Sequence, residues 1–162
     1  ALVSSRVPFA GRRVASRGSG SPDLALYRID RSLRVGTTTD GIYGDGWMGS
    51  QAQYSVFVSP GDRPGRMVVT LGRTGWGGPD VPGRVKITLG RPAAFGPGLA
   101  EVYGLRLWIV HRLDERTFVF AARRPPLRVV VEVNPTFSPS QFGLADTRQL
   151  GAQVSFSFQA KR

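Results

Sequence analysis

The sequence contains no cysteine, and this absence excludes disulfide bonds and thiolate metal sites. Histidine occurs once, at His111, and the only lysines are Lys86 and Lys161. No apolar run approaches the roughly 20 residues that a transmembrane helix needs, so no membrane span is predicted within these residues. Because the chain begins at Ala1 rather than at a methionine, we expect it to be a segment of a longer protein.

What is present indicates a globular, turn-rich chain. Of its 162 residues, 41% are hydrophobic and 20% are charged, and there are 21 glycines and 12 prolines, which is typical of a folded protein with many strands. The formal net charge of +11 favours anionic partners. Most of the cations are arginines scattered along the sequence, without a basic tract or an RNA-binding strand motif, so nucleic acid is not an expected partner.

Hydrophobic periodicity predicts strands throughout most of the chain. Apolar and other residues alternate with period two in about eight short segments that are separated by Gly- and Pro-containing turns. The predicted strands are residues 24–29, 53–58, 66–71, 84–89, 105–110, 117–122, 127–134 and 153–159. We therefore predict an all-β fold, a two-sheet antiparallel β-sandwich that is jelly-roll-like, with a closed barrel as the alternative.

The domain boundary is predicted from composition. Residues 12–22 are mostly Arg, Gly and Ser, so residues 1–22 are predicted to be a tether or an irregular N-terminal segment, and residues 23–162 the β-sandwich domain. Within the predicted strand 105–110, Leu105, Leu107 and Ile109 form the apolar row. Trp108 falls in the opposite row, where it lines a sheet surface or packs beneath a loop.

A Gly-rich segment, residues 40–49, contains two aromatic and two acidic side chains. Tyr43, Asp45 and Trp47 could flank a sugar site, or carbonyl and Asp oxygens could bind a hard cation such as calcium. The acidic spacing of an EF-hand loop is absent, so the metal signal is weak. Burial of Trp47 between the sheets is the favoured alternative.

Trp76 is the strongest single candidate for ligand binding. Glycines stand on both sides of it in residues 72–80, and they could leave the indole exposed or lining a groove. An aromatic face suits the C–H face of a sugar ring, and Arg73 and Asp80 would supply hydrogen-bond donors and acceptors. The favoured alternative is that Trp76 is a packed anchor of its loop.

Catalytic residues are not predicted. His111 stands at a strand end, and no Gly-x-Ser-x-Gly nucleophile elbow occurs. Most of the carboxylates stand in turns, where Asp is ordinary. A small carbohydrate-active enzyme on a jelly-roll scaffold is the alternative, and it would require two close carboxylates in a groove, or one carboxylate with His111.

The last loop and strand carry a family resemblance. Residues 137–151 form a turn segment before the last strand. Pro139 and Gly143 mark a bend in it, and Asp146 and Arg148 can organise a tight loop. Together with residues 26–29, 40–43, 45–49, Ala52 and Tyr54, this segment resembles the C-terminal soluble part of bacterial multi-pass membrane glycosyltransferases of the cell envelope, of the arabinofuranosyl- or mannosyltransferase kind. The shared order is aromatic, Pro, Gly, Asp, Arg and Leu-Gly before the closing strand.

The resemblance implies an extracytoplasmic β-sandwich that looks like a carbohydrate-binding module, joined to a membrane-embedded transferase in the cell membrane. The catalytic carboxylate of such transferases belongs to loops between membrane helices, so catalysis is not implied for this chain. The expected function is a non-catalytic accessory domain that binds or positions a cell-envelope polysaccharide or a lipid-linked sugar. A structural module that docks its arginines on anionic lipid is a further alternative. No cofactor is predicted beyond a possible structural calcium.

Overall fold

The computed structural model describes residues 2–4, 12–17, 24–28, 36–58 and 63–161. Contacts within the chain divide it into two units, Ala1–Arg34 and Val35–Arg162. In the first unit, strands β1 (Leu2–Ser4), β3 (Leu24–Arg28) and β2 (Arg12–Arg17) pair antiparallel in that order. The strand predicted at 24–29 therefore exists, and its partners are β1 and β2. The proposed boundary after residue 22 stays a prediction.

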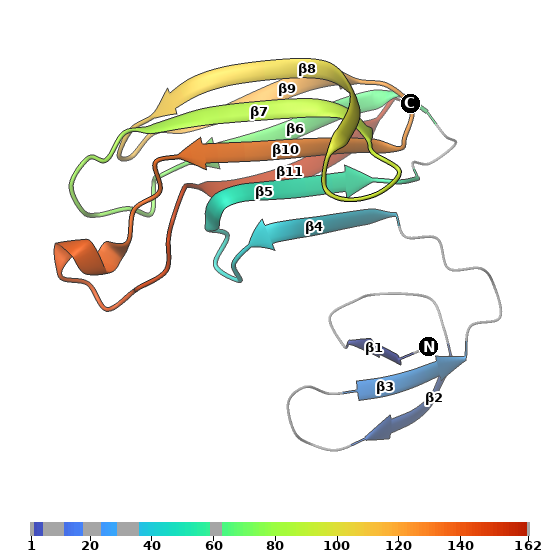
Figure 1. The fold of residues 1–162 in the computed structure, drawn as a ribbon. Helices are drawn as coiled ribbons and strands as arrows, with labels where there is room; N and C mark the ends of the chain where they lie inside the picture. Colours follow the sequence, from blue (N-terminus) through green and yellow to red (C-terminus); the bar gives the residue numbers. More distant parts are fainter. Residues whose placement is uncertain (1, 5–11, 18–23, 29–35, 59–62, 162) are drawn as a thin grey trace. The chain divides into compact units, whose positions relative to one another are not determined.

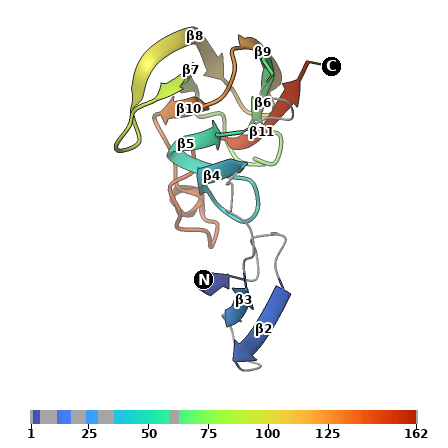
Figure 2. The ribbon, with the colours of Figure 1, turned by 90° about the vertical axis from the view of Figure 1, so that its right-hand side faces the viewer.

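The second unit is a β-sandwich, which confirms the predicted all-β, two-sheet fold (Figures 1 and 2). One antiparallel sheet has five strands in the order β4-β5-β10-β7-β8, and the other has three in the order β11-β6-β9. The bounds in the first sheet are β4 Thr37–Ile42, β5 Met48–Val56, β10 Leu127–Asn134, β7 Gly83–Pro92 and β8 Leu99–Val110. Those in the second are β11 Gln153–Ala160, β6 Gly65–Gly72 and β9 Glu115–Ala122. A jelly roll places its first and last strands side by side in one sheet, whereas β4 and β11 lie in different sheets, so the jelly-roll topology is not confirmed.

The main core lies between the two sheets and is built from alternate residues of the strands. In β6, Met67, Val69 and Leu71 are fully buried, while Arg66 in the alternating row is exposed. The same alternation fills the core from β7 and β10, because successive side chains of a strand point to opposite faces of the sheet. The buried members from these two strands are Val85, Ile87, Leu89, Val129, Val131 and Val133.

Strand β8 turns toward the core the face opposite to the one that its sequence suggests. Trp108 packs inward, with its ring centroid 5.7 Å from that of Phe118, and Val110 is fully buried. Leu107 and Ile109, in the predicted apolar row, are 72% and 52% exposed. The register with β7 decides which row faces the core, and a shift of one residue would exchange the two rows.

Four connections gather at one end of the sandwich, which we name the loop end: the turn at 43–47, the loop at 73–82, the loop at 135–152 and the turn at 111–114 (Figure 1). Backbone hydrogen bonds join the first to the third, because Met48 N–H donates to Ala152 O at 2.8 Å and Val154 N–H donates to Gly46 O at 3.0 Å. The predicted loop 40–49 is therefore the tip of the β4–β5 hairpin.

Among the described residues of the second unit, the helical structure is the 3₁₀ turn Pro139–Phe142, which Gly143 terminates in the left-handed conformation with φ of 80°. Across the described residues, no helix has the length and apolar character that crossing a membrane would take.

Candidate functional site

Trp76 is buried, so its neighbouring glycines do not leave it exposed as a ligand-binding role would require. Only 3% of its surface is accessible, its Nε1–H donates to Pro79 O at 2.7 Å, and its ring centroid lies 4.5 Å from that of Phe137. A side chain at Gly78 would collide with the indole. The glycine therefore allows the loop to fold back over the ring, and the alternative of a packed loop anchor is confirmed.

Trp47 belongs to the same aromatic cluster, which lies at the loop end. Its ring makes an edge-to-face contact with Phe137, at 6.1 Å between centroids and 89° between planes. Leu150 completes the buried part of this cluster. Trp47 is therefore buried, as the favoured alternative predicts, but its neighbours come from loops and it does not lie in the core between the sheets.

Arg73 is also buried, and two of its three guanidinium nitrogens donate within the protein, whereas its Nη2 is buried with no hydrogen-bond partner among the described residues. Its Nε–H donates to Gly151 O at 2.7 Å, its Nη1 donates to Val81 O, and its guanidinium carbon lies 5.0 Å from the centroid of the Phe137 ring. Burial lowers the pKa of Arg73 from its ordinary value, and the charge of Asp80 opposes that shift. Arg73 therefore ties the loop at 73–82 to the loop at 135–152, and it does not present to a ligand the donors that we expected of it.

Tyr43 and Asp45 meet the terminal segment through Arg148. The two Nη groups of Arg148 donate to Asp45 at 3.2 and 2.7 Å, its Nε and Nη2 donate to Asp146 at 2.7 to 3.1 Å, and its guanidinium carbon lies 4.8 Å from the Tyr43 ring centroid. The hydrogen bonds from Arg148 lower the pKa of both carboxyl groups, and the two carboxylates raise the pKa of Arg148. The prediction that Asp146 and Arg148 organise a tight loop is confirmed.

Neither carboxylate of this cluster is suited to acid catalysis or to calcium. Both are held ionised by Arg148, so neither can serve as a general acid near neutral pH. A cation beside Asp45 would have to compete with the guanidinium that already occupies both carboxylate oxygens. Among the residues that the structure describes, no group of three or more His, Cys, Asp or Glu side chains could hold a metal ion.

Asp80 pairs with the single histidine. His111 Nδ1 lies 2.8 Å from one carboxylate oxygen of Asp80, and the backbone N–H of Arg112 donates to the other at 2.7 Å. The hydrogen bond with His111 lowers the pKa of Asp80. This is a carboxylate–histidine pair of the kind that the enzyme alternative requires, but it lies outside the grooves described below. In the described part of the chain, no serine or threonine hydroxyl is hydrogen-bonded to His111.

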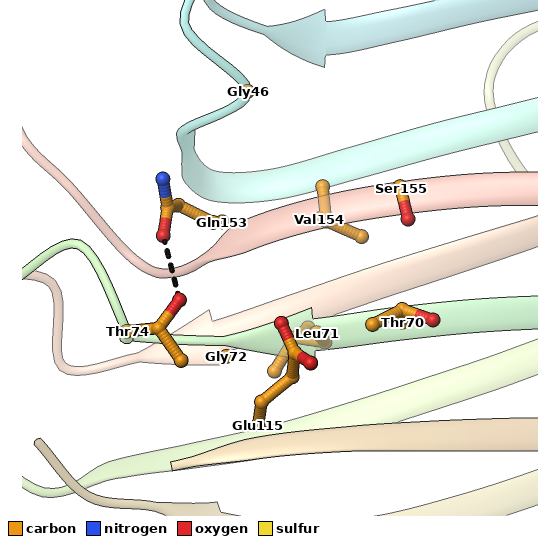
Figure 3. A pocket seen from close by; sticks show the side chains of 9 residues that line it. All are labelled: Gly46, Thr70, Leu71, Gly72, Thr74, Glu115, Gln153, Val154 and Ser155. Carbon is orange, nitrogen blue, oxygen red and sulfur yellow. Dashed lines mark hydrogen bonds between the residues drawn. The ribbon is translucent and has the colours of Figure 1, made fainter. Parts of the chain in front are cut away.

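A groove that the sequence analysis missed lies on the three-stranded sheet, beside the turn at 43–47 (Figure 3). Its volume is about 270 Å³. It is lined by residues of β6, β9 and β11 and of two turns: Gly46, Thr70, Leu71, Gly72, Thr74, Glu115, Gln153, Val154 and Ser155. None of the six predicted site residues lines it, although Gly46 stands between Asp45 and Trp47.

The groove offers mixed hydrogen-bonding groups. Gln153 Oε1 accepts from Thr74 Oγ1 at 3.4 Å and from Gly75 N–H at 3.1 Å, which leaves its Nε2 to donate elsewhere (Figure 3). Thr70 and Ser155 are cross-strand neighbours, and Glu115 contributes a carboxylate. Among the described residues that line the groove there is no Arg or Lys.

A second, shallower groove of about 310 Å³ borders the β4–β5 hairpin. Tyr43 contributes to it together with Gly49 and Gln51. The guanidinium of Arg148 lies over the Tyr43 ring, so that one face of this aromatic side chain is already occupied.

The predicted site residues thus lie in three places: Trp47, Trp76 and Arg73 around Phe137, Tyr43 and Asp45 around Arg148, and Asp80 beside His111. The resemblance to membrane glycosyltransferases rests on the sequence motifs alone. No protein-family model, curated protein or solved structure matches the chain.

Proposed function

We propose that this β-sandwich is a non-catalytic binding module, and that its ligand is a neutral glycan held in the groove on the three-stranded sheet. The observation that carries the proposal is the lining of the groove, which combines hydroxyl, amide and carboxylate groups from three strands. A sugar presents hydroxyl groups that both donate and accept hydrogen bonds, and a site with both kinds of group is complementary to it.

The charge of the groove distinguishes a glycan from a phosphate-bearing ligand. The sequence has a formal net charge of +11, yet the charged side chain among the described lining residues is Glu115. A carboxylate repels phosphate and accepts hydrogen bonds from sugar hydroxyls. A polysaccharide segment therefore fits this groove better than the phosphate end of a lipid-linked sugar.

The wider role that we propose is an accessory domain of a cell-envelope glycosyltransferase, extracytoplasmic and joined to the membrane-embedded part of the same polypeptide. This role is supported by the sequence resemblance and by the way its motifs meet. The contacts of Arg148 with Asp45 join residues 40–49 to residues 137–151, the two segments that carry most of the resemblance. We infer that these motifs build the loop end and so position the edge of the groove at Gly46.

Ligand-observed NMR with soluble arabinan and mannan oligosaccharides tests the proposal. The double variant Glu115→Gln and Ser155→Ala removes one carboxylate and one hydroxyl from the groove, and we expect affinity to fall roughly 3- to 30-fold. Ser157→Ala is the matched control, because Ser157 is an exposed serine on the same row of β11, outside the groove. Equal binding by the double variant and the wild type, or no binding of any neutral glycan, would contradict the proposal.

A further inference from the structure

The outer face of β8 carries a row of exposed aliphatic side chains. Leu107 is the most exposed of them at 72%, and Val102, Leu105 and Ile109 are exposed as well. This strand is the edge of the five-stranded sheet. Exposed aliphatic side chains scattered singly are ordinary, whereas a continuous row of them marks an interaction surface.

Irregular pairing keeps this row on one face. Strand β7 pairs Thr88 with Leu105 and Gly90 with Val102, and the register shifts between these two pairs. The shift adds a residue to β8, and without that residue Val102 would turn to the inner face. The extra residue therefore extends the apolar row along the strand, and it also interrupts the backbone edge at which a further strand would pair.

Cations border the row on the same face of the sheet. Arg84 is the cross-strand neighbour of Ile109 and is exposed, and Lys86 is the neighbour of Leu107. Lys86 forms an ion pair with Glu132 at 2.9 Å. Arg84 has no carboxylate partner among the described residues, so its charge is available to an anionic surface.

We propose that the outer face of β8 docks on the surface of an anionic lipid bilayer. The aliphatic row enters the boundary between head groups and acyl chains, while Arg84 and its neighbours contact lipid phosphates. Two copies of this face would bring the same cations together, whereas an anionic bilayer neutralises them. This docking surface is separate from the groove, and it does not depend on glycan binding.

Co-sedimentation of the 162-residue chain with phosphatidylcholine vesicles, with and without phosphatidylglycerol, tests this inference. We expect binding to the anionic vesicles that weakens with salt. The double variant Leu107→Ser and Ile109→Ser should lower the partition coefficient roughly tenfold or more, because two apolar side chains no longer enter the interface. Arg84→Gln should lower it about fivefold.

Two control variants separate this surface from the general attraction of a cationic protein. Val119 is 51% exposed on the outer face of the other sheet, and Arg66 is an exposed cation of that sheet. Val119→Ser and Arg66→Gln should each reduce binding less than the corresponding β8 variant. Thermal unfolding checks that all variants are folded.

Three results would overturn the inference: no binding to anionic vesicles, equal loss from the β8 and control variants, or a dimer in sedimentation analysis that Leu107→Ser dissociates. The last result would assign the face to a second copy of the chain.

Discussion

The loop end and the outer face of β8 differ in whether their large apolar side chains are buried or exposed. At the loop end, Trp47 and Trp76 stand among glycines in turns and are buried against Phe137. On β8, Leu107 and Ile109 stand in a long regular strand and are exposed. Local sequence suggests the reverse for both β8 residues and leaves both outcomes open for Trp76.

The difference shows that a distant partner decides burial in each case. Trp76 is covered because Phe137 and Leu150 arrive from another loop, and Gly78 lets its own loop fold over it. Leu107 is uncovered because the register with β7 turns Trp108 and Val110 into the core in its place. In a sandwich, where most contacts are long-range, alternation indicates a strand without showing which of its faces is inside.

The largest expected effect comes from Trp76→Ala, which should lower the free energy of unfolding by about 3–5 kcal/mol, because the aromatic cluster would lose its central contact. Leu107→Ser, on the exposed row, should change it by less than about 0.5 kcal/mol. Urea unfolding followed by intrinsic fluorescence and by circular dichroism measures both. A Trp76→Ala cost within the range of the Leu107 variant would break the comparison, since the cluster would then contribute little to the fold.

Two adjacent residues of β8 give a sharper test, in which the expected change in the free energy of unfolding is of intermediate size. Val110 is fully buried and Ile109 is half exposed. Val110→Ala should therefore cost about 2 kcal/mol, and Ile109→Ala less than about 0.5 kcal/mol. Chemical denaturation of the two variants in parallel measures the difference. The reverse order would show that the apolar row Leu105, Leu107 and Ile109 faces the core, as its sequence suggests.

Periodicity was sufficient to predict the strands whose inner rows are hydrophobic and alternate regularly with mostly polar residues. The segments at 66–71, 84–89, 127–134 and 153–159 correspond to β6, β7, β10 and β11. Strand β4 was not predicted, because this edge strand is exposed along most of its length and carries no alternation. The all-β class thus follows from local pattern, whereas the division into sheets depends on pairing between strands that are far apart in sequence.

The candidate site was predictable only in part. The sequence indicated that Asp146 and Arg148 form a tight loop, because they stand two residues apart among turn residues. It could not indicate that Asp45 joins them, which requires the β4–β5 hairpin to meet the last loop. The groove left a faint signal in the polar row of β11, where Gln153 and Ser155 alternate with the core, but the pairing order β11-β6-β9 is what brings Thr70 beside them.

The smallest effect is expected from Arg148→Gln, because ion pairs that are open to solvent are screened. The pKa values of Asp45 and Asp146 are lowered by Arg148, so the stability that these contacts contribute is present above the ordinary carboxyl pKa of about 3.9 and is lost as the pH falls through the lowered values. The melting temperature of the wild type should therefore exceed that of Arg148→Gln at pH 7, and the gap should close below about pH 4.

Differential scanning calorimetry across this pH range measures the gap, and Arg66→Gln is the control. Arg66 is exposed and has no ion-pair partner among the described residues, so its variant should show no gap that closes in acid. A gap for Arg148→Gln that persists unchanged at low pH would mean that packing of the guanidinium over Tyr43, rather than its two carboxylate partners, holds the terminal segment against the hairpin. The loop end would then be stabilised by aromatic contacts throughout, and its contrast with the exposed aliphatic row of β8 would be sharper still.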